Sequence, residues 1–203
     1  MSEKVLFKFV ITGGPCAGKT SAMAILKEIF EKEGYSVVII PETATEFICS
    51  GISPWTMDTN VNYQKYQLKL QLEKERLYCE AAAHLAKCEK LIILIDRGGM
   101  DNKAYLSDSD FNGILDELEL REDDILSRYD AVFHLETNAK TGIGYTLSNN
   151  RARTETPEEA VRLDDRTVSV WLRHPYHRVI KCTDTLEEKA QILANEILAF
   201  IRK

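Results

Sequence analysis

Residues 5–21 read Val-Leu-Phe-Lys-Phe-Val-Ile-Thr-Gly-Gly-Pro-Cys-Ala-Gly-Lys-Thr-Ser. The apolar run over 5–11 predicts a buried strand, because it is short and rich in β-branched and aromatic residues. The turn after it fits the spacing G-x-x-x-x-G-K-[ST], with Gly13, Gly18, Lys19 and Thr20 at the fixed positions. A helical pattern follows at once. This order of strand, glycine-rich turn and helix is typical of a phosphate-binding loop in an α/β fold.

The residue types in this turn suit a triphosphate. Glycines let the backbone curl so that its N–H groups point at phosphate oxygens, and the first turn of the following helix adds its dipole. Lys19 supplies a positive charge at the β- and γ-phosphates, and the Thr20 hydroxyl is placed to bind Mg²⁺. An ordinary tight turn is disfavoured because every fixed position is filled. We therefore expect ATP or GTP to bind at Gly13, Gly14, Pro15, Cys16, Ala17, Gly18, Lys19, Thr20 and Ser21.

The composition is that of an ordinary globular protein. A chain of 203 residues predicts one domain over 1–203 with an ample core. The net charge of −6 disfavours a broad nucleic-acid or anionic-membrane surface. No apolar run approaches the roughly 20 residues of a membrane span, and the N-terminus does not resemble a signal peptide. These features predict a cytoplasmic protein with no nucleic-acid partner and no membrane insertion.

The cysteines predict reduced thiols. They are odd in number and form neither a C-x-x-C pair nor a metal-ligand spacing, as expected for a cytoplasmic chain. The five are Cys16, Cys49, Cys79, Cys88 and Cys182.

Apolar, β-branched runs alternate with helical patterns along the chain, which predicts a buried parallel sheet with helices on both faces. Three helix starts fit a capping box, with Thr43, Thr156 and Thr185 each followed three residues later by a glutamate. Residues from about 60 to 87 predict one long helix able to carry substrate contacts. The predicted strands are Val5–Ile11, Val37–Ile40, Leu91–Ile95, Ala131–Leu135 and Val179–Cys182.

Residues 137–156 have little apolar periodicity and several turn formers. A loop of about 20 residues inside a compact domain is usually a binding element or a lid, and we interpret this one as a lid. Arg151 and Arg153 lie near its end and are placed to reach phosphoryl oxygens. Arginines in such positions accelerate phosphoryl transfer by roughly 10³ to 10⁵.

An acidic residue ends the apolar strand over 91–95. Phosphate-loop proteins place at this point the carboxylate that holds Mg²⁺, and Asp96 fits that role. The alternative is an aspartate that merely caps the next helix. Arg97 follows directly, where mechanical ATPases have a glutamate that activates water. Because an arginine suits the binding of an anionic or hydroxyl-bearing substrate, this residue favours transfer over hydrolysis.

Glu42 follows the strand over 37–40, which Pro41 ends. Its carboxylate should open toward the carboxyl edge of the sheet, where ligands bind in open α/β folds. We interpret it as the group that orients or deprotonates an acceptor hydroxyl. The alternative is a helix-start acid favoured by the dipole. Trp55 and Tyr105 are candidates to stack on an aromatic substrate, although core packing is the alternative for both.

Four stretches resemble one family of phosphate-loop domains. They cover residues 12–20, 41–45, 96–105 and 150–155, with further matches at Glu159-Ala160, Leu163-Asp164 and Trp171. The family is typified by the nucleotide-binding domain of the TRPL translocation defect protein. It is related to the ribosylnicotinamide kinase domain of the bifunctional NAD regulator. The first stretch is widespread, whereas the stretch over 96–105 is far more specific.

The resemblance implies a kinase-like, three-layer α/β fold with a five-stranded parallel sheet in the order 2-3-1-4-5. It also implies ATP or GTP with Mg²⁺ at the phosphate loop, and an acceptor pocket near Glu42, Asp96 and Arg97. Two departures stand out. Longer relatives carry a further domain, for which no residues are left here. The last strand runs into Cys182-Thr183-Asp184 instead of ending in Asp-Asn, which leaves the base preference open.

Two classes of function fit these residues. The leading prediction is a phosphotransferase that moves the γ-phosphoryl group of ATP or GTP to a small hydroxyl-bearing metabolite. Lys19, Mg²⁺ and the lid arginines would stabilise the transferred charge, while Glu42 and Arg97 position the acceptor. The alternative is a non-catalytic, nucleotide-dependent regulator of a protein or phosphoinositide partner, with membrane contact limited to lipid headgroups. A motor subunit of the AAA+ type is disfavoured by Arg97 and by the missing lid domain.

Overall fold

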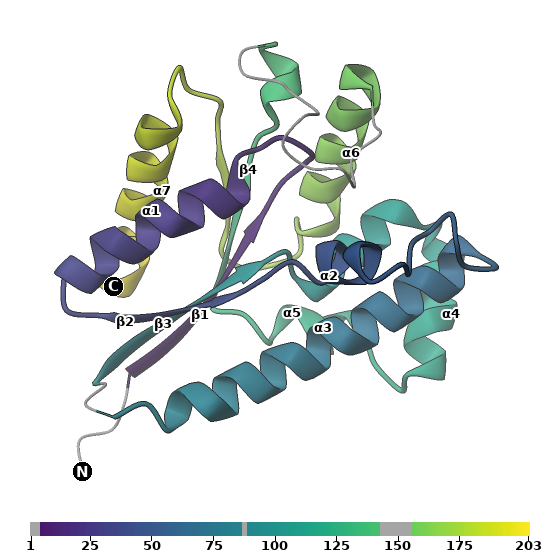
Figure 1. The fold of residues 1–203 in the computed structure, drawn as a ribbon, viewed down its shortest axis with the longest axis horizontal. Coiled ribbons are helices and arrows are strands. Elements are labelled where there is room, and N and C mark those ends of the chain that lie inside the picture. The colour runs from purple at the N-terminus through teal and green to yellow at the C-terminus, as the bar shows by residue number, and fades with distance from the viewer. Residues whose placement is uncertain (1–4, 87–88, 143–155) are drawn as a thin grey trace.

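The computed structural model describes residues 5–86, 89–142 and 156–203 (Figure 1). All strand pairs in its five-stranded sheet are parallel, and the strand order is β2-β3-β1-β4-β5. This confirms the α/β class and the order that the resemblance implies. The strands are β1 (Val5–Thr12), β2 (Ser36–Ile40), β3 (Lys90–Asp96), β4 (Ala131–Leu135) and β5 (His177–Ile180).

Helices cover both faces of the sheet (Figure 1). One face packs against α1 (Lys19–Lys32) and α7 (Leu186–Ile201), and the other packs against α3 (Asn60–Ala83) and α4 (Asp108–Glu117). The remaining helices are α2 (Thr43–Cys49), α5 (Glu122–Leu126), α6 (Pro157–Val170) and the 3₁₀ helices η1 (Gly99–Tyr105) and η2 (Asn138–Lys140).

The alternation of side chains along β1 explains the two layers. Phe9 and Ile11 are fully buried in the core beneath α1 and α7, whereas Val10 is fully buried in the opposite core. Successive side chains of a strand point to opposite faces, so a strand covered on both sides is apolar throughout. Trp171 is fully buried in the core of the second face.

Three predicted boundaries are wrong by two residues or more, and the first is the start of β5, which lies at His177 rather than Val179. Strand β5 ends at Ile180 rather than Cys182, because the next two residues bind Glu136 instead of extending the sheet. Lys181 Nζ lies 3.0 Å from Glu136 Oε1, and the Cys182 N–H donates to Glu136 Oε2 at 3.2 Å. Helix α3 ends at Ala83 rather than near residue 87, because the next two N–H groups make the tighter i→i−3 bonds that close a helix.

The predicted helix starts are confirmed at two of three positions. Thr156 and Thr185 accept hydrogen bonds from the N–H groups of Glu159 and Glu188, at 3.2 Å and 3.1 Å. Thr43 is not a cap, since it is the first residue of α2 and its hydroxyl donates to the Gln71 side chain. The cap position belongs to Glu42, whose side chain makes no capping bond because it has other partners.

The predicted lid over 137–156 is described only at its ends. Helix η2 occupies 138–140, and Thr156 caps α6. Residues 143–155, including Arg151 and Arg153, lie outside the described part of the chain. The four described cysteines form no disulfide with one another, and Cys88 is also outside this part. Within the described ranges, none of the helices combines the length and apolar character needed to cross a bilayer.

Candidate functional site

The phosphate loop, residues 13–20, curls between the end of β1 and the start of α1. Gly13 and Gly18 have φ values of +142° and +81°, which side chains rarely tolerate. A Cβ on Gly13 would lie 2.1 Å from the Leu135 carbonyl oxygen, so the close approach of β4 requires glycine there. Helix α1 begins at Lys19 without a side-chain cap. A helix start without a capping side chain is a favourable place for an anion to bind.

Lys19 is held inside this loop. Its side chain is buried, and Nζ donates to the carbonyl oxygens of Gly13 and Gly14, at 3.1 Å each. The charge therefore lies within the curl of backbone where the sequence predicts the phosphates.

Thr20 of α1 and Asp96 at the end of β3 lie side by side at the phosphate loop. The register of β1 and β3 pairs Ile11 with Asp96, which brings this carboxylate to the phosphate loop. The Thr20 hydroxyl donates to Asp96 Oδ2 at 3.0 Å. Asp96 Oδ1 is buried and has no hydrogen-bond partner among the described residues. The pKa of Asp96 is raised, because the effect of burial exceeds the lowering effect of the nearby Lys19 charge.

This pair of oxygen donors fits a divalent cation. Mg²⁺ prefers carboxylate and hydroxyl oxygens, and a buried carboxylate oxygen without a partner is costly unless a ligand satisfies it. The alternative for Asp96, a helix cap, is wrong, since the next helix, η1, has Gly98 at its cap position and Asp101 accepts the Gly98 N–H at 2.7 Å.

Glu42, which is partly buried, and Arg97, which is buried, form an ion pair beside the loop. Strands β2 and β3 are neighbours, so the residues that follow them meet, and Arg97 Nε lies 2.5 Å from Glu42 Oε1. Arg97 has a φ of +67°, and its backbone is fixed at both ends, by the Ile11 carbonyl at 3.2 Å and the Gln71 amide at 3.1 Å. Bonds of this kind are what hold a strained backbone in place.

The Glu42 carboxylate stays ionised. Burial raises its pKa, but the charges of Arg97 and Lys19 and the Thr45 hydroxyl, 2.6 Å away, lower it further, to about 2. A group with this pKa is a weak base at neutral pH. It is well suited to accept a hydrogen bond from a hydroxyl.

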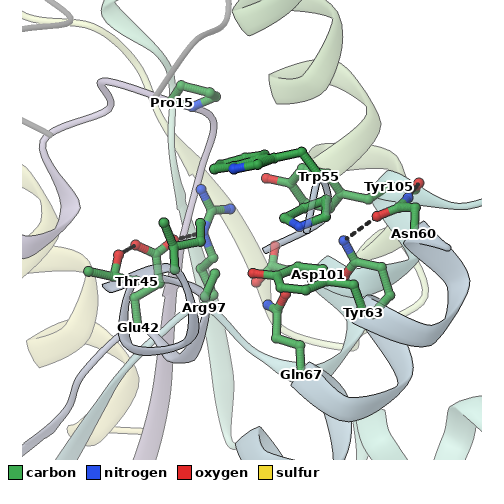
Figure 2. Close-up of a pocket in the computed structure, with 14 residues that line it drawn as sticks. Pro15, Glu42, Thr45, Trp55, Asn60, Tyr63, Gln67, Arg97, Asp101 and Tyr105 are labelled. Carbon is green, nitrogen blue, oxygen red and sulfur yellow. Dashed lines mark hydrogen bonds and ion pairs between the residues drawn. The ribbon is translucent and has the colours of Figure 1, made fainter. Parts of the chain in front are cut away.

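A cavity of about 350 Å³ opens beside this ion pair. Figure 2 shows Glu42 and Arg97 on one side of it and Asn60, Tyr63 and Tyr105 on the other. Three buried polar atoms of its lining, Tyr63 OH, Gln64 Oε1 and Arg97 Nη1, find no hydrogen-bond partner within the part of the chain that the structure describes. The lining also includes Pro15 of the phosphate loop, Ala44, Thr45, Ile48, Pro54, Trp55, Gln67 and Asp101.

Trp55 is not a core residue. Its side chain is 62% exposed and lines the cavity, as does Tyr105 (Figure 2). The core alternative is therefore wrong for Trp55. An exposed indole next to an open cavity is available for stacking on a bound ring.

Helix α3 contributes residues that the sequence reasoning did not single out. Gln64, Gln67 and Gln71 are all buried, and their spacing of three and four residues puts them on one helix face toward the site. The Gln71 side chain donates a hydrogen bond to the Arg97 carbonyl and accepts one from the Thr43 hydroxyl. The three glutamines recur at helical spacing, and this pattern in the sequence could have identified them as one face of the helix.

Asp164 of α6 is a fully buried carboxylate behind the phosphate loop. Its Oδ1 accepts from the Gly14 N–H at 2.9 Å and from His134 Nε2 at 2.9 Å, and its Oδ2 lies 2.9 Å from Lys140 Nζ. Burial raises its pKa, but the His134 and Lys140 contacts and the Gly14 bond lower it further, from 3.8 to about 2.

A carboxylate with a lowered pKa makes stability depend on pH. The Asp164 contribution is fully present above pH 3.8 and is lost as the pH falls through about 2, amounting to roughly 2 kcal/mol. In urea unfolding, the difference between the unmodified protein and Asp164→Asn should shrink by about this amount between about pH 7 and about pH 2. A difference that stays constant over this range would show that the carboxylate is not selectively stabilised in the fold.

The parallel sheet, the glycine-rich loop and the Lys19, Thr20 and Asp96 set define a phosphate-loop domain of the NTPase type. A family model described as an AAA domain matches residues 8–189, and the chain belongs to this family. Domains of this type bind nucleoside triphosphates, generally with Mg²⁺. No curated protein matches the chain.

Proposed function

We propose that this protein is a phosphotransferase that moves the γ-phosphoryl group of ATP or GTP to a small hydroxyl-bearing metabolite. The observation that carries the proposal is the cavity beside the phosphate loop, because Pro15 and the Glu42–Arg97 pair line the same space. A hydrolase needs no such cavity, whereas a transferase must hold an acceptor next to the triphosphate. The resemblance to the ribosylnicotinamide kinase domain supports the same reading, with 1–203 as one domain.

Different groups in and around the phosphate loop bind the phosphates and the metal ion of the nucleotide. The N–H groups over 16–20 and Lys19 take the phosphate oxygens, and Lys19 exchanges its Gly13 and Gly14 carbonyls for them. Thr20 and Asp96 hold Mg²⁺, which when bound neutralises charge on the β- and γ-phosphates. Arg151 and Arg153 are proposed to contact the transferred group.

Glu42 and Arg97 position the acceptor. The acceptor hydroxyl donates to Glu42, and Arg97 Nη1, which is buried without a partner among the described residues, donates to a second acceptor oxygen. The bond from the acceptor oxygen to phosphorus forms while the bond to the departing diphosphate breaks, and the hydroxyl proton passes to Glu42. The loose transition state of phosphoryl transfer needs little early deprotonation, so a carboxylate with a pKa of about 2 is sufficient.

The charges of the cavity favour an uncharged acceptor. Glu42 and Arg97 neutralise each other, Asp101 adds a negative charge, and the remaining polar groups include the amides of Asn60 and Gln64. A phosphoinositide headgroup would bring several negative charges to this surface, where the described residues offer one arginine that is already paired. The chemistry therefore supports a transferase over a phosphoinositide-dependent regulator.

Nucleotide consumption tests the proposal. Purified protein with Mg²⁺ and ATP or GTP is incubated alone and with pools of nucleosides, sugars and other hydroxylated metabolites, and ADP or GDP is measured. The proposal expects diphosphate to appear when an acceptor is present, with a phosphorylated product in equal amount. Turnover that is slow and independent of every pool would support the regulator instead.

Trp55→Ala should weaken acceptor binding selectively. Loss of the exposed indole should raise the KM for the acceptor found in the screen by about tenfold, because stacking on a ring and its buried area are lost. The Kd for Mg·ATP and the melting temperature should not change. Leu172→Ala is the control, since Leu172 is 68% exposed and does not line the cavity. Equal KM values in the two variants would remove Trp55 from the acceptor site.

A further inference from the structure

Three side chains hold the phosphate loop from the side of β4, α6 and α7. Asp164 of α6 accepts the Gly14 N–H at 2.9 Å, and Lys189 of α7 donates to the Ala17 carbonyl at 3.1 Å. Thr137, just after β4, donates its hydroxyl to the Pro15 carbonyl. These contacts use backbone groups of the loop and do not involve the side chains of Lys19, Thr20 or Asp96.

Asp164 is the most constrained of the three. It is fully buried, and its Oδ1 also accepts the Thr137 N–H at 3.1 Å, in addition to Gly14 and His134. The packing is close, since a Cβ on Gly14 would lie 2.8 Å from Asp164 Oδ1. Three donors and the Lys140 ammonium thus converge on one carboxylate, and one of the donors is an amide of the phosphate loop.

We propose that Asp164 is a positioning residue that keeps the phosphate loop in the conformation that binds the triphosphate. The inference rests on the proposed function in one respect, that the loop binds a nucleotide. Apparent affinity falls in proportion to the fraction of molecules in the competent conformation. A contact that holds the loop without touching the ligand therefore acts on nucleotide affinity.

The exchange of partners by Lys19 explains why an external contact is needed. In the structure, Lys19 bonds the Gly13 and Gly14 carbonyls and so closes the loop on itself. When Lys19 turns to the phosphates, these two bonds are lost. The bond from Gly14 to Asp164 lies on the buried side of the loop and is unaffected by this change. It thus preserves the curl at the step when the loop loses its own internal bonds.

The test compares two neighbouring aspartates of α6. Asp164→Asn keeps the shape of the side chain, but its NH₂ group must face either the three N–H donors or the Lys140 ammonium. Asp165→Asn is the control, because Asp165 lies 2.8 Å from the same Lys140 and makes no contact with the loop among the described bonds. The Kd for Mg·ATP is measured by titration with a fluorescent ATP analogue, at a temperature where melting curves show both variants folded.

Asp164→Asn should bind Mg·ATP about tenfold more weakly, since a hydrogen bond to a charged group is lost. Asp165→Asn should stay within about twofold. Equal Kd values for the unmodified protein and a folded Asp164→Asn would overturn the inference and leave the proposed function standing. Failure of the unmodified protein to bind any purine triphosphate would overturn both.

A second measurement needs no variant. In nitrogen-15-labelled protein, hydrogen exchange of the Gly14 amide should remain slow when Mg·ATP is added, because the bond to Asp164 persists. Fast exchange of this amide in the nucleotide-bound protein would contradict the inference, even if Asp164→Asn fails to fold.

Discussion

Lys19→Ala should abolish nucleotide binding, with a Kd for Mg·ATP raised by at least about 100-fold. The Lys19 ammonium is buried within the phosphate loop and donates to the Gly13 and Gly14 carbonyls, so its removal takes the charge out of the curl of backbone that is proposed to bind the phosphates. Charge-assisted hydrogen bonds to phosphate contribute about 1.5–3 kcal/mol each, and the loss of two gives an effect of this size. The measurement is titration with a fluorescent ATP analogue in the presence of Mg²⁺.

Lys27→Ala is the matched control for this experiment. Lys27 lies two turns further along α1, is about half exposed and pairs with Glu31 at 3.8 Å. Its replacement removes the same charge from the same helix, so a general electrostatic effect would appear in both variants. Binding by Lys19→Ala within about threefold of the Lys27→Ala value would contradict the assigned role of the loop.

Glu42→Gln should leave nucleotide binding intact and reduce phosphoryl transfer by about 10²–10⁴. Glutamine keeps the length of the side chain, but it cannot take the acceptor proton. The substitution also breaks the ion pair with buried Arg97, which should lower stability by about 3–5 kcal/mol. Rates are therefore compared well below the melting temperature of the variant, with the acceptor at saturating concentration.

Glu46→Gln provides the comparison, because Glu46 lies one turn along α2, pairs with Lys74 at 2.7 Å and does not line the cavity. It should retain full transfer. If Glu42→Gln loses nucleotide binding as completely as Lys19→Ala, then Glu42 supports the phosphate loop and is not the group that positions the acceptor.

The sequence alone was sufficient to predict the features of the fold and site that local patterns determine. The strand β1, the phosphate loop and the start of α1 follow from glycine spacing and apolar runs. The positions of Asp96 and Glu42 at the carboxyl edge follow from the ends of β3 and β2. The contact between Glu42 and Arg97 depends in addition on β2 and β3 being neighbours, which the strand order implied by the resemblance supplies and local pattern does not.

Features that depend on long-range contacts could not be predicted from local sequence patterns. The end of β5 depends on Glu136, 45 residues before Lys181. The start of α2 departs from a capping box because Glu42 binds Arg97, 55 residues away. Asp164 contacts Gly14 across 150 residues, so the local pattern on α6 does not assign it a role at the phosphate loop, although the resemblance matches Leu163-Asp164. Trp55 is exposed although a tryptophan is more often packed in a core.

Isothermal titration calorimetry with Mg·ATP and Mg·GTP tests the central claim most directly, since every proposed role depends on a triphosphate at residues 13–20. The account predicts saturable binding of at least one of the two at a stoichiometry of one, with loss of the signal in Lys19→Ala. Absence of binding heat for both nucleotides at several temperatures, in protein that melts cooperatively, would contradict it.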